Sequence, residues 1–512
     1  MTNYIQSREY NMSTAEPNLL SELILLDLQS ASQISLQMRI YKVIAQAVLS
    51  GTITPGHRLP STRALSKEIG VSRITITIAY DKLSAEGYIV TQQGKGTFVA
   101  NTYPAEIAVL PVSDAPVVNE EIELSQRSMA FLTANNNQSG AEGPFIPGLA
   151  DTANFPFHIW QRMLNRYSNK FYAFLTGYGN DGGYWPLREA LSEYLQISRA
   201  VKCEPEQILI TMGTNQSLDL CALMLTDNSS KAIIEDPCNW SVPVIWKAAN
   251  LDIDFVGIDA EGLCLHKYPF NEPSTGKNPK LVFTTPSNQY PMGSVMSLTR
   301  RRYILEMAQK YNFWIIEDDY DSEFRYDTKP FPSLQGLDTH GRVIYLGTFS
   351  KTLFPGLRLS YMVVPKKLVK PFTLGLSQIY RPGQLLLQAG LSDFIREGYF
   401  ASHIRKMRII YSERMQEMHR ALQEYFGDLI IFTHSNSGLH VTIEFIQPFN
   451  QQKMTELALS YGITLRELTV YQHVVEKRQG YVLGFGGIKR EDIAPAIKLL
   501  KKIYLTSEVG IG

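Results

Sequence analysis

The stretch GTFSKTLFPGLR, residues 347–358, directly follows the strand-like apolar run RVIYL at residues 342–346. It places one lysine, Lys351, in a loop of small and hydroxyl residues, with a Pro-Gly turn and Arg358 behind it. Such a lysine is either an ordinary surface charge or a nucleophile held in a pocket at the end of a strand. The neighbouring segments favour the second interpretation.

An acidic segment lies about thirty residues earlier, in FWIIEDDYDSEFRYD at residues 313–327. Its apolar strand ends in carboxylates, which therefore emerge at the carboxyl edge of a sheet, where α/β proteins build ligand sites. An acid, a lysine and an arginine at such an edge fit pyridoxal phosphate (PLP). The lysine would form the Schiff base, the acid would keep the pyridine nitrogen protonated, and the arginine with helix-start amides would hold the phosphate.

Short apolar strands alternate with helical stretches through the second part of the chain. This alternation predicts an α/β domain over residues 140–512 with a mostly parallel central sheet. The predicted strands are QILIT, KAIIED, LDIDFVGID, PKLVFTT, FWIIEDD, GRVIYLGT and LSYMVV.

Composition excludes several classes of protein. The 512 residues suffice for two or three domains, and 44% are apolar. The chain has 49 basic residues (Lys plus Arg) and 49 acidic residues (Asp plus Glu), so its net charge does not identify a partner. The four cysteines show no metal-ligand spacing, and no apolar run approaches a membrane span or a secretory leader. We therefore expect a reduced, cytoplasmic protein without a metal site.

The first part of the chain predicts a winged helix-turn-helix. We expect a flexible N-terminus over 1–21, a compact domain over 22–101 and a linker over 102–139. Within the domain, helices are predicted at 41–49, 62–69 and 73–86, followed by a hairpin that turns at 93–96. Residues 35–100 hold eight Lys or Arg against three Asp or Glu, a net charge of +5 that suits a phosphate backbone. The alternative is a structural module with a solvated basic face.

The compact domain resembles the GntR-type winged-helix domain of bacterial repressors. The resemblance rests on PGHRLPSTRALSKEIGVSRITITIAYDKLSAEGYI at 55–89 and on GKGTF at 94–98. It implies contacts with double-stranded DNA from both helices and from the wing tip. The implied DNA-binding residues are Arg63, Arg73, Thr75, Gln93, Gly94 and Lys95.

The second part resembles the fold-type I PLP enzymes related to aspartate aminotransferase, which carry a smaller C-terminal subdomain. The motifs are ITMGTNQSLDL, IIEDPCNW, TTPSNQYPMG, WIIEDDYDSEFRY and YLGTFSKTLFPGLRLSY. Joined to the first domain, the chain is similar to MocR/GabR-type transcriptional regulators over about 480 residues. This resemblance implies a head-to-tail homodimer.

The same resemblance assigns roles to individual residues. Lys351 would form the Schiff base, Asp318 would pair with the pyridine nitrogen, and Arg358 would bind the phosphate. The other implied cofactor residues are Tyr320, at the phenolic oxygen; Thr348 and Ser350, with their hydroxyls; Gly213, Thr214 and Asn215, as a phosphate cup; Trp240, stacked on the ring; and Tyr178, reaching the partner's phosphate. For Asp318 and Trp240 the alternatives are a solvated strand-end acid and an ordinary core residue.

Some positions depart from the family pattern. Val482 and Val242 stand where amino-acid-binding relatives carry an arginine for the substrate carboxylate. Because a buried carboxylate without a partner is costly, both valines argue against a GABA-like or dicarboxylate ligand. Arg466 is a candidate substitute from a loop. Tyr290 replaces an asparagine before the proline of SNQYPMG, so Asn288 or Gln289 would supply that hydrogen bond.

These observations predict a PLP-dependent regulator that binds operator DNA as a homodimer and senses an amine, or PLP itself, through an aldimine at Lys351. Two rivals stay open. One is an active aminotransferase with an accessory DNA-binding head. The other is a DNA-binding protein whose large domain is a cofactor-free dimerisation scaffold.

Overall fold

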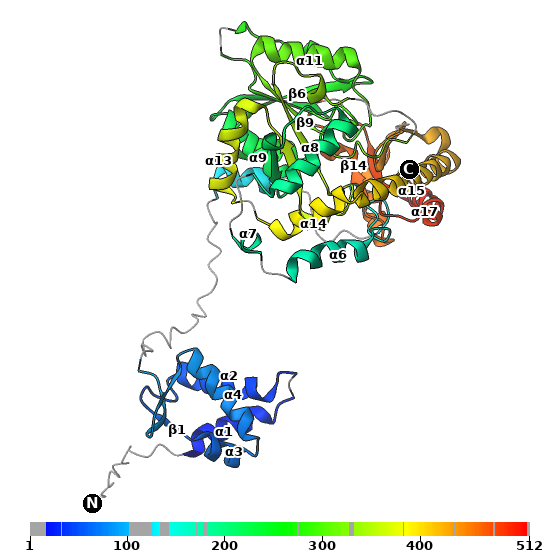
Figure 1. The fold of residues 1–512 in the computed structure, drawn as a ribbon. Coiled ribbons are helices and arrows are strands. Elements are labelled where there is room, and N and C mark those ends of the chain that lie inside the picture. The colour runs from blue at the N-terminus through cyan, green and yellow to red at the C-terminus, as the bar shows by residue number, and fades with distance from the viewer. Residues whose placement is uncertain are drawn as a thin grey trace, which may run out of the picture. The chain divides into compact units, whose positions relative to one another are not determined.

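The computed structural model describes residues 17–31, 33–101, 124–133, 143–169, 172–177, 182–273, 276–326, 332–381, 383–433, 436–474 and 477–508. The chain divides into two compact units, Met1–Ile122 and Glu123–Gly512, which Figure 1 labels by element. Each unit is described by itself.

The first unit is a winged helix-turn-helix. Its helices are α1 (Pro17–Leu28), α2 (Leu36–Leu49), α3 (Thr62–Ile69) and α4 (Arg73–Ala85). Strands β1 (Arg58–Leu59), β2 (Ile89–Gln92) and β3 (Gly96–Val99) form an antiparallel sheet in the order β1-β3-β2. The Ser61 and Ser72 hydroxyls accept hydrogen bonds from backbone amides and so cap α3 and α4. The predicted second and third helices and the hairpin are confirmed.

The N-terminal boundary of this unit corrects the prediction. Residues 17–21, predicted to be flexible, belong to α1, whose Leu20 and Ile24 are buried in the core of the unit. The Ser21 hydroxyl donates to Glu68 on α3 at 2.5 Å. The start of α1 was not predicted because the preceding sequence is polar and because the helix is stabilised by tertiary packing. In addition, α2 begins five residues before the predicted Tyr41, and β1 lies between the helices predicted at 41–49 and 62–69.

The second unit is built on an eight-stranded sheet in the order β4-β11-β10-β9-β8-β5-β6-β7. Strands β5, β6, β8, β9 and β10 pair in parallel, whereas β11 runs against both of its neighbours. The seven predicted strands are therefore confirmed. Their bounds, with β7, are β4 (Ile208–Thr211), β5 (Lys231–Asp236), β6 (Asp252–Asp259), β7 (Gly262–Leu263), β8 (Leu281–Thr284), β9 (Trp314–Asp318), β10 (Val343–Thr348) and β11 (Ser360–Val363).

Helices cover both faces of this sheet. Ile234 and Ile316 pack in the core on one face, and their neighbours Ile233 and Ile315 pack in the core on the other. Burial on both faces explains why these strands are almost continuously apolar. The helices of this region are α6 (Phe157–Ser168), α7 (Ala173–Thr176), α8 (Trp185–Arg199), α9 (Thr214–Leu225), α10 (Ser241–Ala248), α11 (Leu298–Tyr311), α12 (Leu334–Leu337), α13 (Val369–Ile379) and α14 (Leu385–Arg396).

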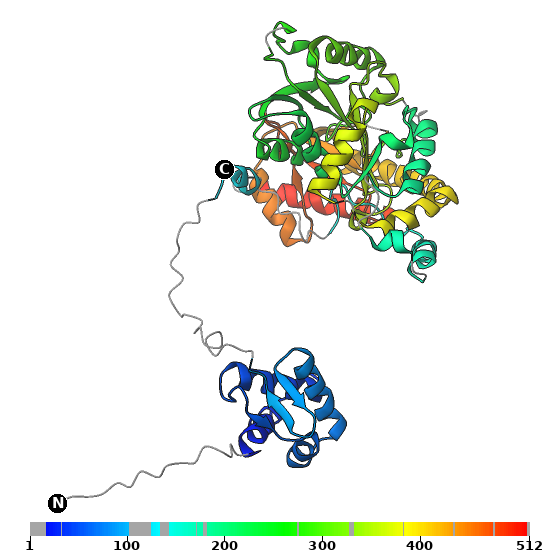
Figure 2. The same cartoon turned by 60° about the vertical axis from the view of Figure 1, so that its left-hand side comes forward.

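A smaller C-terminal subdomain lies next to the large sheet, orange and red in Figure 2. Its antiparallel sheet has the order β12-β13-β15-β14, and along β13 residues 441, 443 and 445 enter the core while 440, 442 and 444 take the opposite face. Its elements are α15 (Tyr399–Tyr425), β12 (Ile430–Phe432), β13 (His440–Phe445), α16 (Gln451–Ser460), β14 (Arg466–Glu467), β15 (Gly480–Gly484) and α17 (Arg490–Glu508).

The predicted linker over 102–139 is wrong in part. Helix α5 (Gln126–Thr133) lies inside that range and contacts α10 of the second unit. The helix is too short to show a sustained period in the sequence, so its packing against α10 could not be foreseen. Separately, no helix within the described ranges is long and apolar enough to span a membrane.

A matched pair of isoleucines on α4 tests the core of the first unit. Ile76 is fully buried, whereas Ile74, two residues earlier, is 72% exposed. We expect Ile76→Ala to lower the free energy of unfolding of this unit by about 2–4 kcal/mol, because it leaves a cavity. Chemical denaturation followed by circular dichroism measures the change. Ile74→Ala is the control and should change stability by less than about 0.5 kcal/mol; equal losses would contradict the packing described.

Candidate cofactor site and nucleic-acid interface

A cavity of about 270 Å³ opens at the carboxyl ends of the central strands of the second unit. Of the eleven cofactor residues predicted from the sequence, the cavity is lined by Lys351, Asp318, Tyr320, Arg358, Thr348, Ser350, Gly213, Thr214, Asn215 and Trp240. Tyr178 lies outside the described residues. Residues up to 145 positions apart in the chain are thus brought to one sheet edge.

Lys351 lies just beyond β10 with its amine inside the cavity. Its Nζ donates a hydrogen bond to the carbonyl of Gly148 at 2.9 Å. Gly148 has a φ of 80°, in the left-handed region that favours glycine, and a Cβ there would lie 2.4 Å from the Lys351 nitrogen. Burial lowers the pKa of Lys351, against the opposing charges of Asp321 and Asp318. This shift favours the neutral amine that nucleophilic attack needs.

Asp318, the last residue of β9, presents its carboxylate to the cavity. Its Oδ1 is buried and has no hydrogen bond within the described part of the chain. Burial, reinforced by the charges of Asp319 and Glu235, raises the pKa of Asp318 to about 7. An orphaned buried acid of this kind is suited to a protonated ring nitrogen, so the residues present fit PLP at this end.

The other end of the cavity is shaped for an anion. Gly213 caps the N-terminus of α9 at φ 128°, and a Cβ there would lie 2.7 Å from Nη2 of Arg358. The first turn of α9 therefore points backbone amides toward the same space as the Arg358 guanidinium. The Thr348 hydroxyl accepts from Ser360 Oγ at 2.8 Å and from the Ser350 amide at 3.2 Å, which fixes the neighbouring hydroxyls. The arrangement fits a phosphate.

A polar network beside Tyr320 includes residues that the sequence left open or missed. Asn288 donates to the Tyr320 hydroxyl at 3.1 Å and to both oxygens of Asp321, at 3.1 and 3.0 Å. Gln289 donates instead to Glu235 and to the carbonyl of Pro237. Asn288, and not Gln289, is therefore the amide that reaches Tyr320. Asp321 lines the cavity although it lies beyond the end of β9, where strand alternation no longer predicts direction.

The aromatic wall of the cavity is backed by an apolar cluster. Leu468, Tyr471 and Val482 form this cluster, and Trp240 and Tyr290 pack against it. Val482 therefore makes apolar contacts here, with Arg466 opposite it on β14. Val242 is buried elsewhere, in the core on one face of the large sheet.

His440, which the sequence did not single out, also lines the cavity. His440 Nε2 lies 3.0 Å from the Pro291 carbonyl, and burial lowers the pKa of His440 to about 4.

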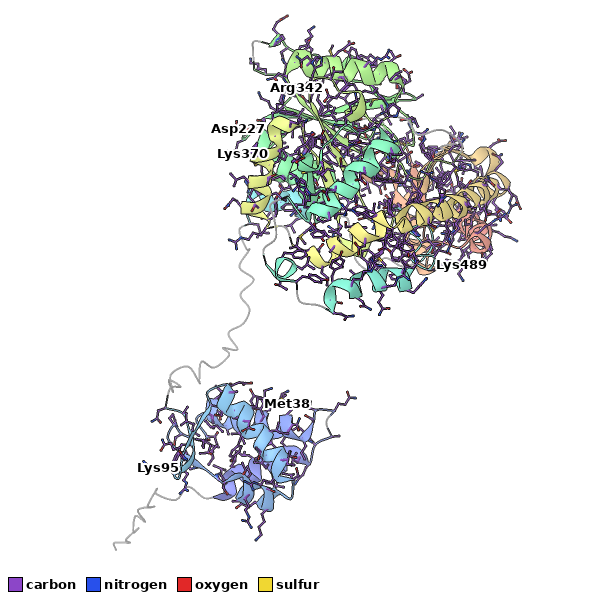
Figure 3. All side chains as sticks on the ribbon, in the orientation of Figure 1. Met38, Lys95, Asp227, Arg342, Lys370 and Lys489 are labelled. Carbon is purple, nitrogen blue, oxygen red and sulfur yellow. The ribbon has the colours of Figure 1, made fainter. Side chains whose placement is uncertain are left out.

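The predicted DNA-binding residues lie on the surface of the first unit. Arg63 and Arg73 are exposed on α3 and α4, and Thr75 is half-buried in the first turn of α4. Gln93, Gly94 and Lys95 are exposed at the hairpin turn, where Figure 3 labels Lys95. The sequence missed Ile74, which is 72% exposed beside Arg73. An apolar side chain at that place suits the methyl group of thymine in the major groove.

Comparison with known families matches both units. Residues 36–99 match "Bacterial regulatory proteins, gntR family", and residues 174–475 match "Aminotransferase class I and II". The chain is 33% identical over 488 residues to the "Probable rhizopine catabolism regulatory protein MocR" of Rhizobium meliloti, covering 94% of this chain and 97% of that protein. It is 29% identical to the "HTH-type pyridoxine biosynthesis transcriptional regulator PdxR" of Corynebacterium glutamicum, over 88% and 92% of the two chains.

Solved structures resemble the second unit. A kynurenine aminotransferase from Pyrococcus horikoshii, solved in complex with PMP, superposes with a TM-score of 0.67 and is 26% identical. The match covers 75% of this chain and 95% of that enzyme.

We expect Asp318→Asn to stabilise the cofactor-free chain and to weaken the binding of PLP. Between pH 3.8 and about 7 the folded cofactor-free chain keeps a proton on Asp318 that the unfolded chain has lost, so stability falls as pH rises through this window. Without cofactor, we expect the variant to be more stable at pH 8 by roughly 1–4 kcal/mol. With cofactor, it should bind PLP more weakly, because asparagine cannot pair with a protonated pyridine nitrogen.

Thermal unfolding with and without PLP at pH 5 and pH 8 measures both effects. Asp227→Asn, labelled in Figure 3 and not among the residues that line the cavity, is the control and should leave both unchanged. An Asp318→Asn chain that binds PLP as well as the wild type would contradict the assignment.

Proposed function

Because this chain belongs to the MocR-type transcriptional regulators, in which a gntR-family winged helix precedes a class I and II aminotransferase domain, we propose that it controls transcription in response to PLP held at Lys351. The first unit would bind operator DNA, with two chains of a homodimer contacting two half-sites. The second unit would serve as the sensor. Cofactor binding would then change operator affinity, which requires only a differential affinity between two arrangements of the chain.

One observation carries this proposal. One cavity is lined by Lys351, Asp318 and Arg358. The pKa of the Lys351 amine is lowered, Oδ1 of Asp318 has no hydrogen-bond partner within the described residues, and the Arg358 guanidinium lies beside the start of α9. PLP supplies an aldehyde, a ring nitrogen and a phosphate, and each matches one of these groups. An unmatched buried carboxylate would be a net cost to a cofactor-free scaffold, which counts against that rival.

PLP itself is the effector that the cavity wall favours. Val482 lies in an apolar cluster against which Trp240 and Tyr290 of the cavity wall pack, so position 482 supplies no cation for an effector carboxylate. Arg466, opposite Val482 on β14, is not among the residues that line the cavity. Val242 is buried away from the cavity. The relative named for pyridoxine biosynthesis agrees with a role in PLP supply, whereas the one named for rhizopine catabolism points to amine metabolism. PLP supply is therefore our first choice of regulated pathway.

An active aminotransferase with an accessory DNA-binding head is the second candidate. The lowered pKa of Lys351 favours it, because transamination needs the same nucleophilic amine. Multiple turnovers of amino-group transfer to a keto acid would establish this activity. A single turnover, or none, would leave sensing as the function.

Operator binding with and without PLP tests the proposal. The probe is DNA from upstream of this protein's own gene, at one fixed salt concentration. We expect PLP alone to change the affinity several-fold, and Lys351→Ala to abolish the change. Lys370→Ala, an exposed lysine on α13 labelled in Figure 3, is the matched control and should respond as the wild type does. If only an added amine shifts the affinity, PLP is merely the chemical handle and Arg466 becomes the next residue to change.

The DNA face is tested separately with Arg73→Ala. Because Arg73 starts the recognition helix, we expect operator binding to weaken by about 1–3 kcal/mol. Lys42→Ala, an exposed lysine on α2, is the control and should have little effect. Fluorescence anisotropy with labelled operator measures both. Equal losses for the two variants would mean that α4 does not read the DNA and that binding follows total charge alone.

A further inference from the structure

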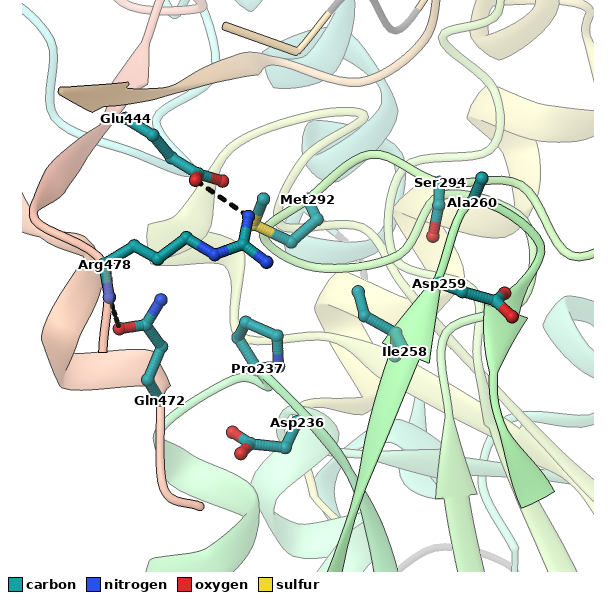
Figure 4. Close-up of a pocket in the computed structure, with 10 residues that line it drawn as sticks. All are labelled: Asp236, Pro237, Ile258, Asp259, Ala260, Met292, Ser294, Glu444, Gln472 and Arg478. Atoms are coloured by element: carbon teal, nitrogen blue, oxygen red, sulfur yellow. Dashed lines mark hydrogen bonds and ion pairs between the residues drawn. The ribbon is translucent and has the colours of Figure 1, made fainter. Parts of the chain in front are cut away.

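A second cavity, of about 310 Å³, lies between the large sheet and the C-terminal subdomain (Figure 4). Its walls come from the ends of β5 and β6, from Met292 and Ser294, from β13, and from Gln472 and Arg478. It shares no lining residue with the cofactor cavity. Its volume is within the range of small-molecule sites, which begins near 300 Å³.

Two of the three carboxylates around this cavity are engaged elsewhere. Asp236 accepts hydrogen bonds from the amides of His473 and Val474, at 2.9 and 2.8 Å. Asp259 accepts from the amide of Glu261 at 2.9 Å and from Arg300 at 3.0 Å, and Figure 4 shows its carboxylate turned away from the cavity. These acids therefore need no cation from a ligand.

The polar groups that remain are mainly donors. Arg478 uses Nη1 to contact Glu444 at 2.9 Å, which neutralises that acid and holds the guanidinium over the cavity. Gln472 accepts the Arg478 amide with its Oε1 at 3.0 Å, so its NH2 group is the part left to donate. Ser294 Oγ is buried and has no hydrogen-bond partner within the described ranges. The Arg478 guanidinium and the Gln472 amide lie on one side of the cavity in Figure 4 and are together complementary to a carboxylate, whereas the Ser294 hydroxyl lies on the other side.

The remaining walls are apolar and supply the second half of the recognition. Pro237, Ile258 and Met292 line the space between the donors. Apolar walls with a few placed polar groups are typical of a site for a small organic molecule. We propose that this cavity binds a small organic carboxylate with a short apolar body, as a ligand site separate from that of the cofactor.

Three segments of the chain contribute residues to both cavities, and they connect the second cavity structurally to the cofactor cavity. Pro237 lines the second cavity and Trp240, three residues on, lines the first. In the second segment, Tyr290 lines the first cavity and Met292 lines the second.

The third element is β13, on which His440 faces the cofactor cavity and Glu444 faces the second one, both on the strand face opposite the core. A ligand in the second cavity therefore contacts the segments that carry the cofactor wall, and we expect the two sites to be coupled.

Calorimetric titration of the full-length, PLP-loaded chain tests the site. The probes are 4-methylpentanoate and its uncharged amide, neither of which carries an amine that could react at Lys351. We expect the acid to bind at least tenfold more tightly than the amide. Arg478→Gln should remove at least tenfold of the affinity for the acid. Arg490→Gln removes a similarly exposed arginine, paired with Glu413, and should change nothing.

Several results would overturn the inference. They are the absence of binding up to about 10 mM acid, equal affinities for acid and amide, or full affinity in Arg478→Gln. Competition between the acid and PLP for the cofactor-free chain would place the acid in the first cavity instead. If PLP itself fails to bind, the titration on the cofactor-free chain still decides this site, because its dependence on Arg478 does not rest on the proposed function.

Discussion

The burial of a run of acids at the end of β9 is the constraint on which the second unit depends. Each acid needs its own compensation, because a buried charge without a partner is costly. Asp319 is paired with Arg199 at 2.7 Å, and this charge with further hydrogen bonds holds the pKa of Asp319 below its usual value despite burial. Glu317 accepts hydrogen bonds from the first two backbone amides of α12, those of Leu334 and Gln335. Asp318 is the acid whose Oδ1 has no partner within the described chain, and it faces the cavity.

The packing around these acids follows from the same constraint. Arg199 ends α8, so its pairing with Asp319 ties a helix on the outside of the sheet to the strand that carries the site. The Tyr345 hydroxyl on β10 donates to the same carboxylate at 2.6 Å, which joins the strand of the acid to the strand of the lysine. The relative positions of Asp318 and Lys351 are therefore set by charge neutralisation as well as by the sheet ladder.

Local chemistry made much of the fold predictable. Ser61 and Ser72 mark helix starts because their hydroxyls cap the backbone, and the apolar runs mark strands because both sheet faces are covered. The residues that line the first cavity could also be predicted, because parallel strands bring their carboxyl ends to one edge of the sheet.

Contacts set by distant segments were not predictable. Helix α5 forms next to α10, which lies more than a hundred residues later in the chain. His440 and Asp321 enter the cavity because of how the C-terminal subdomain and the loop after β9 are placed, and no local period encodes either placement. The second cavity lies between the same two parts of the unit, so its lining could not be assembled from motifs.

Arg358 occupies the left-handed region at φ 51°, a conformation that costs a side-chain-bearing residue on the order of 1 kcal/mol. Glycine would relieve that strain and lose the guanidinium. Folding stability and anion binding therefore select for different residues at this position. In relatives whose cavity no longer binds an anion, replacement of Arg358 by glycine or asparagine would be an early sign of that loss.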